Sequence, residues 1–174
     1  GTNNGGEINY VNINTATITS KHDKGVGAIA GLNSGAGTIK NCENRISMKQ
    51  TSEKEWHPNT SGFVNTNYGK IDSCKNYGDV HSESALEVGT AGNVYYGLVS
   101  NSRNFGNIKG ISKVSNVYSG GIVSMNETAN GVSAVVEYSK SKGEISAKSK
   151  SSGSYAGGVA AWNSASVEHS GFEG

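Results

Sequence analysis

The chain has 174 residues, among them 25 glycines, one proline and two cysteines, and only 7% of its residues are aromatic. Basic residues number 15 and acidic residues 14, and the resulting formal net charge of +1 makes no field that would collect nucleic acid or an anionic membrane. No segment approaches the roughly 20 apolar residues needed to span a bilayer. We therefore expect no nucleic-acid partner and no membrane insertion.

A short phrase recurs five times along the chain: a small residue, two apolar residues, two variable residues and then usually asparagine. Its copies end at Asn33, Asn67, Ser102, Asn126 and Asn163. The last position advances by 34, 35, 24 and 37 residues, which lies in the period range of stacked repeat architectures. The repeat predicts a solenoid.

A second phrase lies between the copies of the first and has small or apolar residues at offsets 0, +3, +5, +7 and +9. Its copies begin at Ile39, Ile71, Val99 and Val136, and the copy at Val99 overlaps with the first phrase. This spacing is mostly alternation with one slip, which is typical of two short strands joined by a bend. We expect an all-β fold, a parallel β-solenoid of about five coils with roughly three short strands in each coil.

The longer repeat intervals are expected to carry loop insertions at one edge of the solenoid. These insertions are residues 49–61, 81–96, 109–120 and 146–157. The first contains Glu55, Trp56 and His57, and the second contains Tyr95 and Tyr96. An aromatic side chain on a projecting loop is a common anchor for a sugar or a protein, although Trp56 folded back over the coil edge is an equal alternative. These five residues are the candidate binding residues.

The repeated asparagines have a structural interpretation that needs no ligand. Stacked asparagine side chains can hydrogen-bond from one rung to the next, and asparagine tolerates left-handed backbone angles at a corner. Such a ladder is expected at one corner from Asn33, Asn67, Asn126 and Asn163. A second ladder is expected at another corner from Asn44 and Asn76.

The two cysteines, Cys42 and Cys74, occupy the same offset in consecutive copies of the second phrase. In stacked coils they would lie one above the other, about 4.8 Å apart, within the range of Cα separations that a disulfide allows. Direct stacking also points the two side chains in parallel, which favours a buried thiol ladder. Both alternatives remain open at this point.

No motif in the sequence points to catalysis, a metal or a cofactor. The histidines His22, His57, His81 and His169 show no metal-ligand spacing. Residues 25–30 imitate a dinucleotide fingerprint but lack the strand before it and the helix after it. No carboxylate pair recurs of the kind that a carbohydrate lyase or hydrolase would need. We expect no enzymatic activity, no metal and no cofactor.

Both ends of the chain fit the repeat, and residues 167–174 open a further copy that stops unfinished. We expect one repeat domain over residues 1–174, excised from a longer protein.

Three sequence words carry a resemblance to a known family. Gly-Gly-Ile-Val at residues 120–123, Gly-Thr-Ile-Lys-Asn-Cys-Glu-Asn at 37–44 and Gly-Lys-Ile-Asp-Ser-Cys-Lys-Asn-Tyr-Gly at 69–78 resemble the GLUG-type repeat of large bacterial surface proteins. These include adhesin-like proteins and the non-catalytic regions of secreted IgA-specific zinc metallopeptidases. No His-Glu-x-x-His motif occurs, so no catalytic residue is transferred.

The resemblance implies an exported protein, secreted or on the bacterial cell surface, with neighbouring domains in the same chain. The expected function is a non-catalytic binding or spacer module that presents its edge loops to a host protein or glycan. One alternative is an accessory region of a secreted metallopeptidase that holds the substrate. The other is a carbohydrate-active β-helix enzyme.

Overall fold

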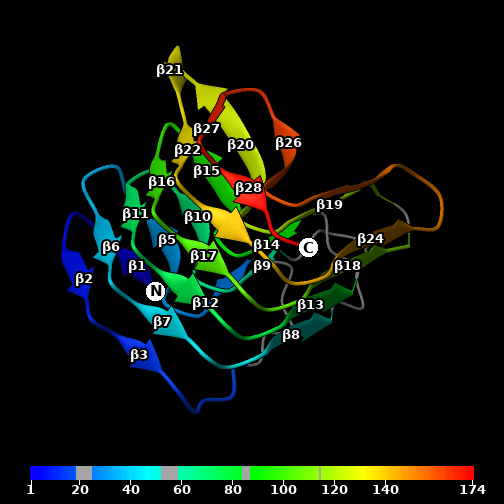
Figure 1. The fold of residues 1–174 in the computed structure, drawn as a ribbon, viewed down its shortest axis with the longest axis horizontal. Helices are drawn as coiled ribbons and strands as arrows, with labels where there is room; N and C mark the ends of the chain where they lie inside the picture. The colour runs from blue at the N-terminus through cyan, green and yellow to red at the C-terminus, as the bar shows by residue number, and fades with distance from the viewer. Residues whose placement is uncertain (19–24, 52–58, 84–86, 114) are drawn as a thin grey trace.

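A computed structural model of the protein describes residues 1–18, 25–51, 59–83, 87–113 and 115–174. Within these residues the chain is all-β, with no helix and with parallel strands in stacked sheets (Figure 1). None of this part forms a helix long and apolar enough to cross a membrane. The stacked parallel sheets are consistent with the predicted β-solenoid.

The described strands form five sheets, here numbered in the order in which the chain first fills them from β5 onward. Sheet I contains β1 (Thr2–Asn3), β5 (Ala30–Asn33), β10 (Val64–Asn67), β15 (Asn93–Tyr95), β20 (Val123–Ala129), β21 (Val132–Ser133) and β26 (Ala160–Asn163). Sheet II contains β2 (Glu7–Asn9), β6 (Thr38–Lys40), β11 (Lys70–Asp72), β16 (Leu98–Ser100), β22 (Val135–Glu137) and β27 (Ser166–Glu168). Sheet III contains β3 (Asn12–Ile13), β7 (Glu43–Asn44), β12 (Lys75–Asn76), β17 (Arg103–Asn104), β23 (Lys140–Ser141) and β28 (Gly171–Phe172).

The other two sheets lie further along each turn of the chain. Sheet IV contains β8 (Met48–Thr51), β13 (Val80–Glu83), β18 (Ile108–Ser112) and β24 (Ile145–Ser149). Sheet V contains β4 (Val26–Gly27), β9 (Thr60–Ser61), β14 (Glu87–Gly89), β19 (Val117–Gly120) and β25 (Ser154–Gly157).

The turns that begin at β5, β10 and β15 each contain five strands, so the prediction of about three is wrong. Between β5 and β10 the chain passes through β6, β7, β8 and β9, one strand in each of the other sheets. The error arose because the segments interpreted as loop insertions contain the strands of sheets IV and V. Their inward positions include polar residues such as Gln50 and Ser82, both buried, so the apolar alternation that marks a strand is weak there.

The register of the second phrase agrees with the pairing of the strands. Ile39, Ile71, Val99 and Val136 lie opposite one another in sheet II, each paired with the next. In sheet IV the same holds for the last position of the phrase, from Met48 through Val80 and Ile108 to Ile145.

One copy of the first phrase was misaligned. Val99 belongs only to the second phrase, and the residue that pairs with both Asn67 and Asn126 in sheet I is Val94. The sequence misled because the segment before Val94 has no two apolar residues in a row. The ladder position in this turn is therefore occupied by valine, where Ser102 had been expected.

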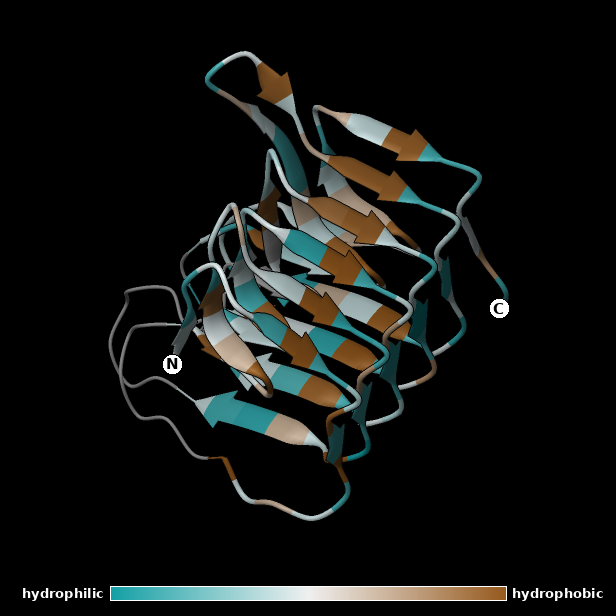
Figure 2. Cartoon of the chain, turned by 90° about the vertical axis from the view of Figure 1, so that its left-hand side faces the viewer, coloured by the Kyte–Doolittle hydropathy of each residue, from teal (hydrophilic) through white to brown (hydrophobic). Residues whose placement is uncertain are grey.

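The interior is a thin apolar column. One cluster of buried residues includes Ile39, Phe63, Ile71 and Val123, and a smaller one, beside sheet IV, contains Ile46, Met48, Val80 and Ile108. Apolar positions lie above one another from strand to strand (Figure 2). Burying such side chains contributes about 1.5 to 3 kcal/mol each, so the stacked column is the main source of stability.

The corners between sheets II and III turn through a left-handed residue. In successive turns this residue is Tyr10, Asn41, Ser73, Asn101, Tyr138 and His169, each with φ between 47° and 56°. The ladder asparagines are not among the positive-φ residues, so the expectation that they form left-handed corners is wrong. Most described glycines also have negative φ, so a left-handed backbone does not explain them. At Gly106 a Cβ would overlap the carbonyl of Gly78, so the close approach of the two backbones explains that glycine.

A β-hairpin projects from sheet I where the sequence had indicated only a small insertion. β20 continues past the ladder position and pairs antiparallel with β21 (Figure 1). Asn130 and Gly131 form the turn with φ of 51° and 75°, as a tight hairpin with two left-handed residues requires.

Candidate functional site

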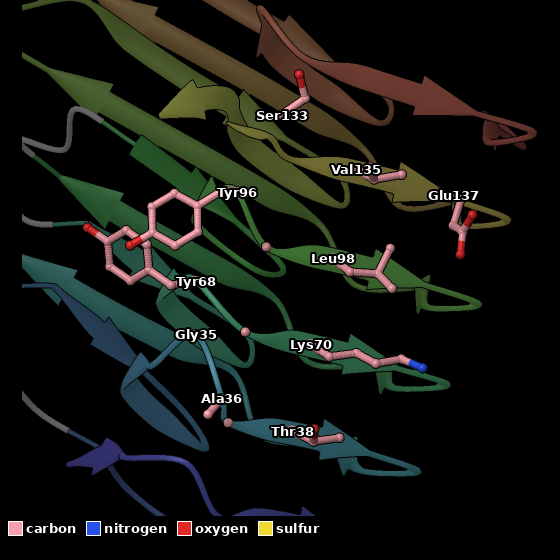
Figure 3. A pocket seen from close by; sticks show the side chains of 13 residues that line it. Gly35, Ala36, Thr38, Tyr68, Lys70, Tyr96, Leu98, Ser133, Val135 and Glu137 are labelled. Atoms are coloured by element: carbon pink, nitrogen blue, oxygen red, sulfur yellow. The ribbon is translucent and has the colours of Figure 1, made fainter. Parts of the chain in front are cut away.

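A groove of about 450 Å³ runs over the outer face of sheet II, across several turns of the chain (Figure 3). Its floor is formed by Thr38, Lys70, Leu98 and Val135, which pair in that order on β6, β11, β16 and β22. Because neighbouring strands lie about 4.8 Å apart, these side chains form a regular row along the stacking direction. The groove therefore suits an extended ligand.

One wall of the groove is aromatic. Tyr68 and Tyr96 line it, with ring centroids 4.9 Å apart, and Tyr95 stacks on Tyr68 at 5.5 Å with an angle of 24° between the ring planes. Tyr96 remains 38% exposed, so part of this residue is open to a ligand. Aromatic rings of this kind present an apolar face together with a hydroxyl that can donate or accept a hydrogen bond.

The charged groups of the groove lie on its floor. Lys70 and Glu137 belong to strands separated by one rung, and Figure 3 shows both side chains along the same face. The Lys70 ammonium also lies 3.5 Å from the carboxylate of Asp72. The groove thus offers a cation, an anion and two apolar side chains to a ligand.

Asp72 is held by several donors beside this groove. Burial by itself would raise the pKa of its carboxyl, but hydrogen bonds from Asn101 and Ser100, together with the charge of Lys70, outweigh burial and lower that pKa. The donors are Asn101 Nδ2 and Ser100 Oγ, each 2.9 Å from Asp72 Oδ1. The network orders the corner next to Lys70.

The structure places the predicted binding residues unevenly. Glu55, Trp56 and His57 lie outside the described residues. Tyr95 ends β15 and Tyr96 follows it, and both contact Tyr68. Tyr68 was missed, although it directly follows Asn67 of the repeat and could have been found from that position.

The sequence analysis also missed the groove residues of sheet II, namely Thr38, Lys70, Leu98, Val135 and Glu137. They occupy outward positions of sheet II, where composition alone does not distinguish a binding face from ordinary surface. Only the strand register brings them into one row.

Two asparagine ladders run through the interior. In the first, which we call the continuous ladder, Asn44 Nδ2 donates to Asn76 Oδ1 and Asn76 Nδ2 to Asn104 Oδ1, both at 2.8 Å, and Asn104 Nδ2 reaches Ser141 Oγ at 3.2 Å. Each amide also donates to a backbone carbonyl two residues ahead. The side chains therefore tie each turn to the next.

The second, which we call the interrupted ladder, is divided by Val94. On one side Asn3 Nδ2 donates to Asn33 Oδ1 at 2.9 Å and Asn33 Nδ2 to Asn67 Oδ1 at 2.8 Å. On the other side Asn126 Nδ2 donates to Asn163 Oδ1 at 2.8 Å. Among the described residues, the buried Asn126 Oδ1 has no hydrogen-bond partner.

Cys42 and Cys74 are free thiols, and both are buried. A hydrogen bond to Cys42, followed by burial, raises the pKa of the Cys74 thiol well above its ordinary value. Further along the same column stand Ser102 and Ser139; Ser102 Oγ accepts from the backbone N–H of Cys74, and Ser139 Oγ accepts from that of Ser102. The position thus belongs to an interior column of small side chains.

One carboxylate pair, not evident from the sequence, appears at the C-terminal end of sheet II. Glu137 on β22 pairs in register with Glu168 on β27, so the two outward side chains start from neighbouring rungs. In the part of the chain that the structure describes, no three His, Cys, Asp or Glu side chains gather as a metal-ligand set.

Comparison with known proteins gives no relative: no protein-family model, no curated protein and no solved structure matches this chain.

Proposed function

We propose that the chain is a non-catalytic binding module of an extracellular bacterial surface protein, a β-solenoid of about five coils that holds a host glycan in the groove of sheet II. The tyrosine wall carries this proposal. Sugar rings present C–H faces that pack on aromatic rings, and tyrosine hydroxyls supply hydrogen bonds at the same place. Tyr96 is the exposed member of the wall.

The other groove residues fit the same ligand class. Leu98 and Val135 give an apolar floor, whereas Lys70 and Glu137 supply a donor and an acceptor for hydroxyl groups. A few convergent polar groups on a mostly apolar surface are typical of ligand sites. A glycan chain lying along the stacking direction would contact one floor residue in each turn.

A glycan array followed by calorimetry on the best glycan tests this proposal. The informative variant is Tyr96→Asn, because Tyr96 has φ of 41° and asparagine tolerates that conformation. Loss of the ring is expected to weaken binding at least about tenfold, or about 1.4 kcal/mol. Tyr155→Asn is the matched control, since Tyr155 is similarly exposed, at 40%, but lies on sheet V.

Two outcomes would overturn the proposal. One is an array on which the wild-type protein binds no glycan. The other is equal weakening by Tyr96→Asn and Tyr155→Asn, which would show a general effect of removing a surface tyrosine.

A carbohydrate-active enzyme is the second candidate, and the paired Glu137 and Glu168 favour it. Glycoside hydrolysis uses two carboxyl groups that flank the scissile bond, about 5 to 9.5 Å apart. Incubation with polysaccharides and measurement of released reducing ends tests this candidate, with Glu168→Gln as the variant that should abolish release. No release from any glycan that the array identifies would dismiss it.

A further inference from the structure

A second surface, distinct from the groove, covers the outer face of sheet III. Lys75, Arg103 and Lys140 pair in register on β12, β17 and β23, and all three side chains point outward, while their neighbours Asn76, Asn104 and Ser141 are buried. We call these three residues the basic column. Successive cations in it lie about one strand spacing, roughly 4.8 Å, apart.

A parallel column is formed by the residues that directly follow the strands β7, β12, β17 and β23. It consists of Arg45, Tyr77, Phe105 and Lys142, whose backbone N–H groups each donate to the preceding turn. Tyr77 and Phe105 stack with centroids 4.9 Å apart and an angle of 7°, and the Arg45 guanidinium lies 4.4 Å from the centroid of the Tyr77 ring. We call this the capped column, because Arg45 and Lys142 flank its two rings; Glu173 follows Lys142 in the next turn, where its backbone N–H donates to Ser141. The Tyr77 ring thus also holds the Arg45 guanidinium through a cation–π contact.

The two columns together carry more positive than negative charge. Glu43 pairs with Arg45 at 2.6 Å and with Lys75 at 3.6 Å, and Glu173 pairs with Lys140 at 2.7 Å. Within the described chain, Arg103 and Lys142 form no ion pair. Two cations of this surface, one in each column, are therefore available to an anion.

Two carboxylates mark the far boundary of the surface. Asp79 and Glu144 stand two residues beyond the capped column, and both are exposed. Asp79 Oδ1 accepts a hydrogen bond from the backbone N–H of Asn107, which holds that carboxylate at the boundary. The positive region is thus a strip along the stacking direction, and these two carboxylates separate it from sheet IV.

A carboxylate of the chain already occupies one end of this strip. The Glu173 carboxylate accepts a hydrogen bond from Lys140, and this bond and the Lys140 charge, with smaller contributions from Arg103 and Lys142, hold its pKa below the ordinary value. The strip therefore stabilises an exposed anionic oxygen group at this point.

We propose that this strip binds an anionic polysaccharide whose sulfate or carboxylate groups follow the row of cations along the stacking direction. Charge complementarity at Arg103 and Lys142 supports an anionic occupant, and arginine can hold two oxygens of one such group at once. The row crosses neighbouring strands at a regular interval, which matches a ligand that carries charges at repeated positions.

The aromatic geometry favours a polysaccharide over a single-stranded nucleic acid. Proteins that bind single strands use aromatic rings as platforms on which bases stack. Here one face of Tyr77 is covered by Arg45 and the other by Phe105, so a base finds no free platform on that ring. Recognition then depends on the cations.

Binding of heparin and polygalacturonate, measured by calorimetry at 50 and 200 mM salt, tests this inference; heparin represents the sulfated source and polygalacturonate the carboxylated one. Wild-type protein should bind at least one of them, and more weakly at the higher salt because screening reduces interactions between exposed charges. Arg103→Gln combined with Lys142→Gln should weaken binding at least tenfold and reduce the salt dependence. Circular dichroism checks that the variant remains folded.

The matched control is Lys148→Gln combined with Lys150→Gln. It removes the same charge from two exposed positions, one on β24 of sheet IV and one directly after that strand. Equal weakening by both double variants, or no binding of either polysaccharide, overturns the inference. Tighter binding of a single-stranded oligonucleotide than of both polysaccharides also overturns it, in favour of a nucleic acid. The Tyr96→Asn variant should keep this binding, so failure here and failure of the groove proposal are separate results.

Discussion

The two asparagine ladders differ at one rung, and the difference shows what these side chains contribute. In the continuous ladder Asn76 and Asn104 each accept from the preceding turn and donate to the next, and Asn44 at the start of the ladder donates to Asn76. In the interrupted ladder Val94 stands between Asn67 and Asn126. Valine joins the apolar core there but has no group for either amide.

Valine in place of asparagine at this rung leaves a polar group unpaired in the neighbouring turn. Asn67 Nδ2 still donates to the carbonyl of Gly69, whereas Asn126 Oδ1 is buried and, within the described chain, without a partner. A buried acceptor left unpaired costs about 1 to 3 kcal/mol. A rung of such a ladder therefore depends on the residues above and below it, and apolar burial and hydrogen bonding compete for the same interior position.

Breaking the continuous ladder at its middle should have the largest effect. Asn76→Ala removes the acceptor of Asn44 Nδ2 and the donor to Asn104 Oδ1, and it also frees the carbonyl of Gly78. With two buried amides affected, we expect a loss of about 3 to 5 kcal/mol. Urea unfolding followed by circular dichroism measures it.

Asn12→Ala is the control for this experiment, because Asn12 is an exposed residue of β3 in the same sheet and should change the stability by less than about 0.5 kcal/mol. A loss below about 1 kcal/mol for Asn76→Ala would contradict the view that the ladder contributes to stability.

Repairing the interrupted ladder should have a smaller effect of opposite sign. In Val94→Asn the new side chain could accept from Asn67 Nδ2 and donate to Asn126 Oδ1, in the same direction as the other rungs. The added bond from Asn67 and the satisfied acceptor of Asn126 together offset the loss of apolar burial, which is about 1.5 to 3 kcal/mol for a buried valine. We expect a net gain of about 1 kcal/mol in the free energy of unfolding.

The matched variant Val94→Ala loses the same apolar contacts without gaining an amide, so it should be less stable than wild type by about 2 kcal/mol. If Val94→Asn is as unstable as Val94→Ala, the ladder geometry does not extend through this rung.

The same competition explains what the sequence could predict. Apolar residues at Ile39, Ile71 and Val136 recur at fixed offsets because the column needs them, and this established an all-β repeat with the correct register in sheet II. Where the interior is filled by buried polar residues, as at Gln50 in sheet IV, the alternation disappears, and two strands in each turn were taken for loops.

The groove could be predicted only in part, for a related reason. Tyr95 and Tyr96 were chosen as an exposed aromatic pair, but Tyr68 and Lys70 belong to another turn and reach the groove through strand pairing. Outward positions are not constrained by core packing, and the residue types on the groove floor differ from turn to turn. A site assembled from them across turns becomes visible only when the register is known.

A pH series should give the smallest effect and separates the ladders from the ionised surface. The pKa of Asp72 is lowered in the folded protein, so its ionised form stabilises the fold above the unfolded-state value of about 3.9, and this contribution disappears as the pH falls through the folded-state pKa. Because Asp72 is partly exposed, Asp72→Asn should cost less than about 1 kcal/mol at pH 7, and the difference from wild type should shrink below pH 4. The ladder amides do not titrate, so the loss in Asn76→Ala should be equal at pH 7 and pH 3, as melting temperatures would show. If the loss in Asn76→Ala changed with pH as the loss in Asp72→Asn does, the interior amides would act through the charged surface. The direct hydrogen bonds between the amides contradict that view.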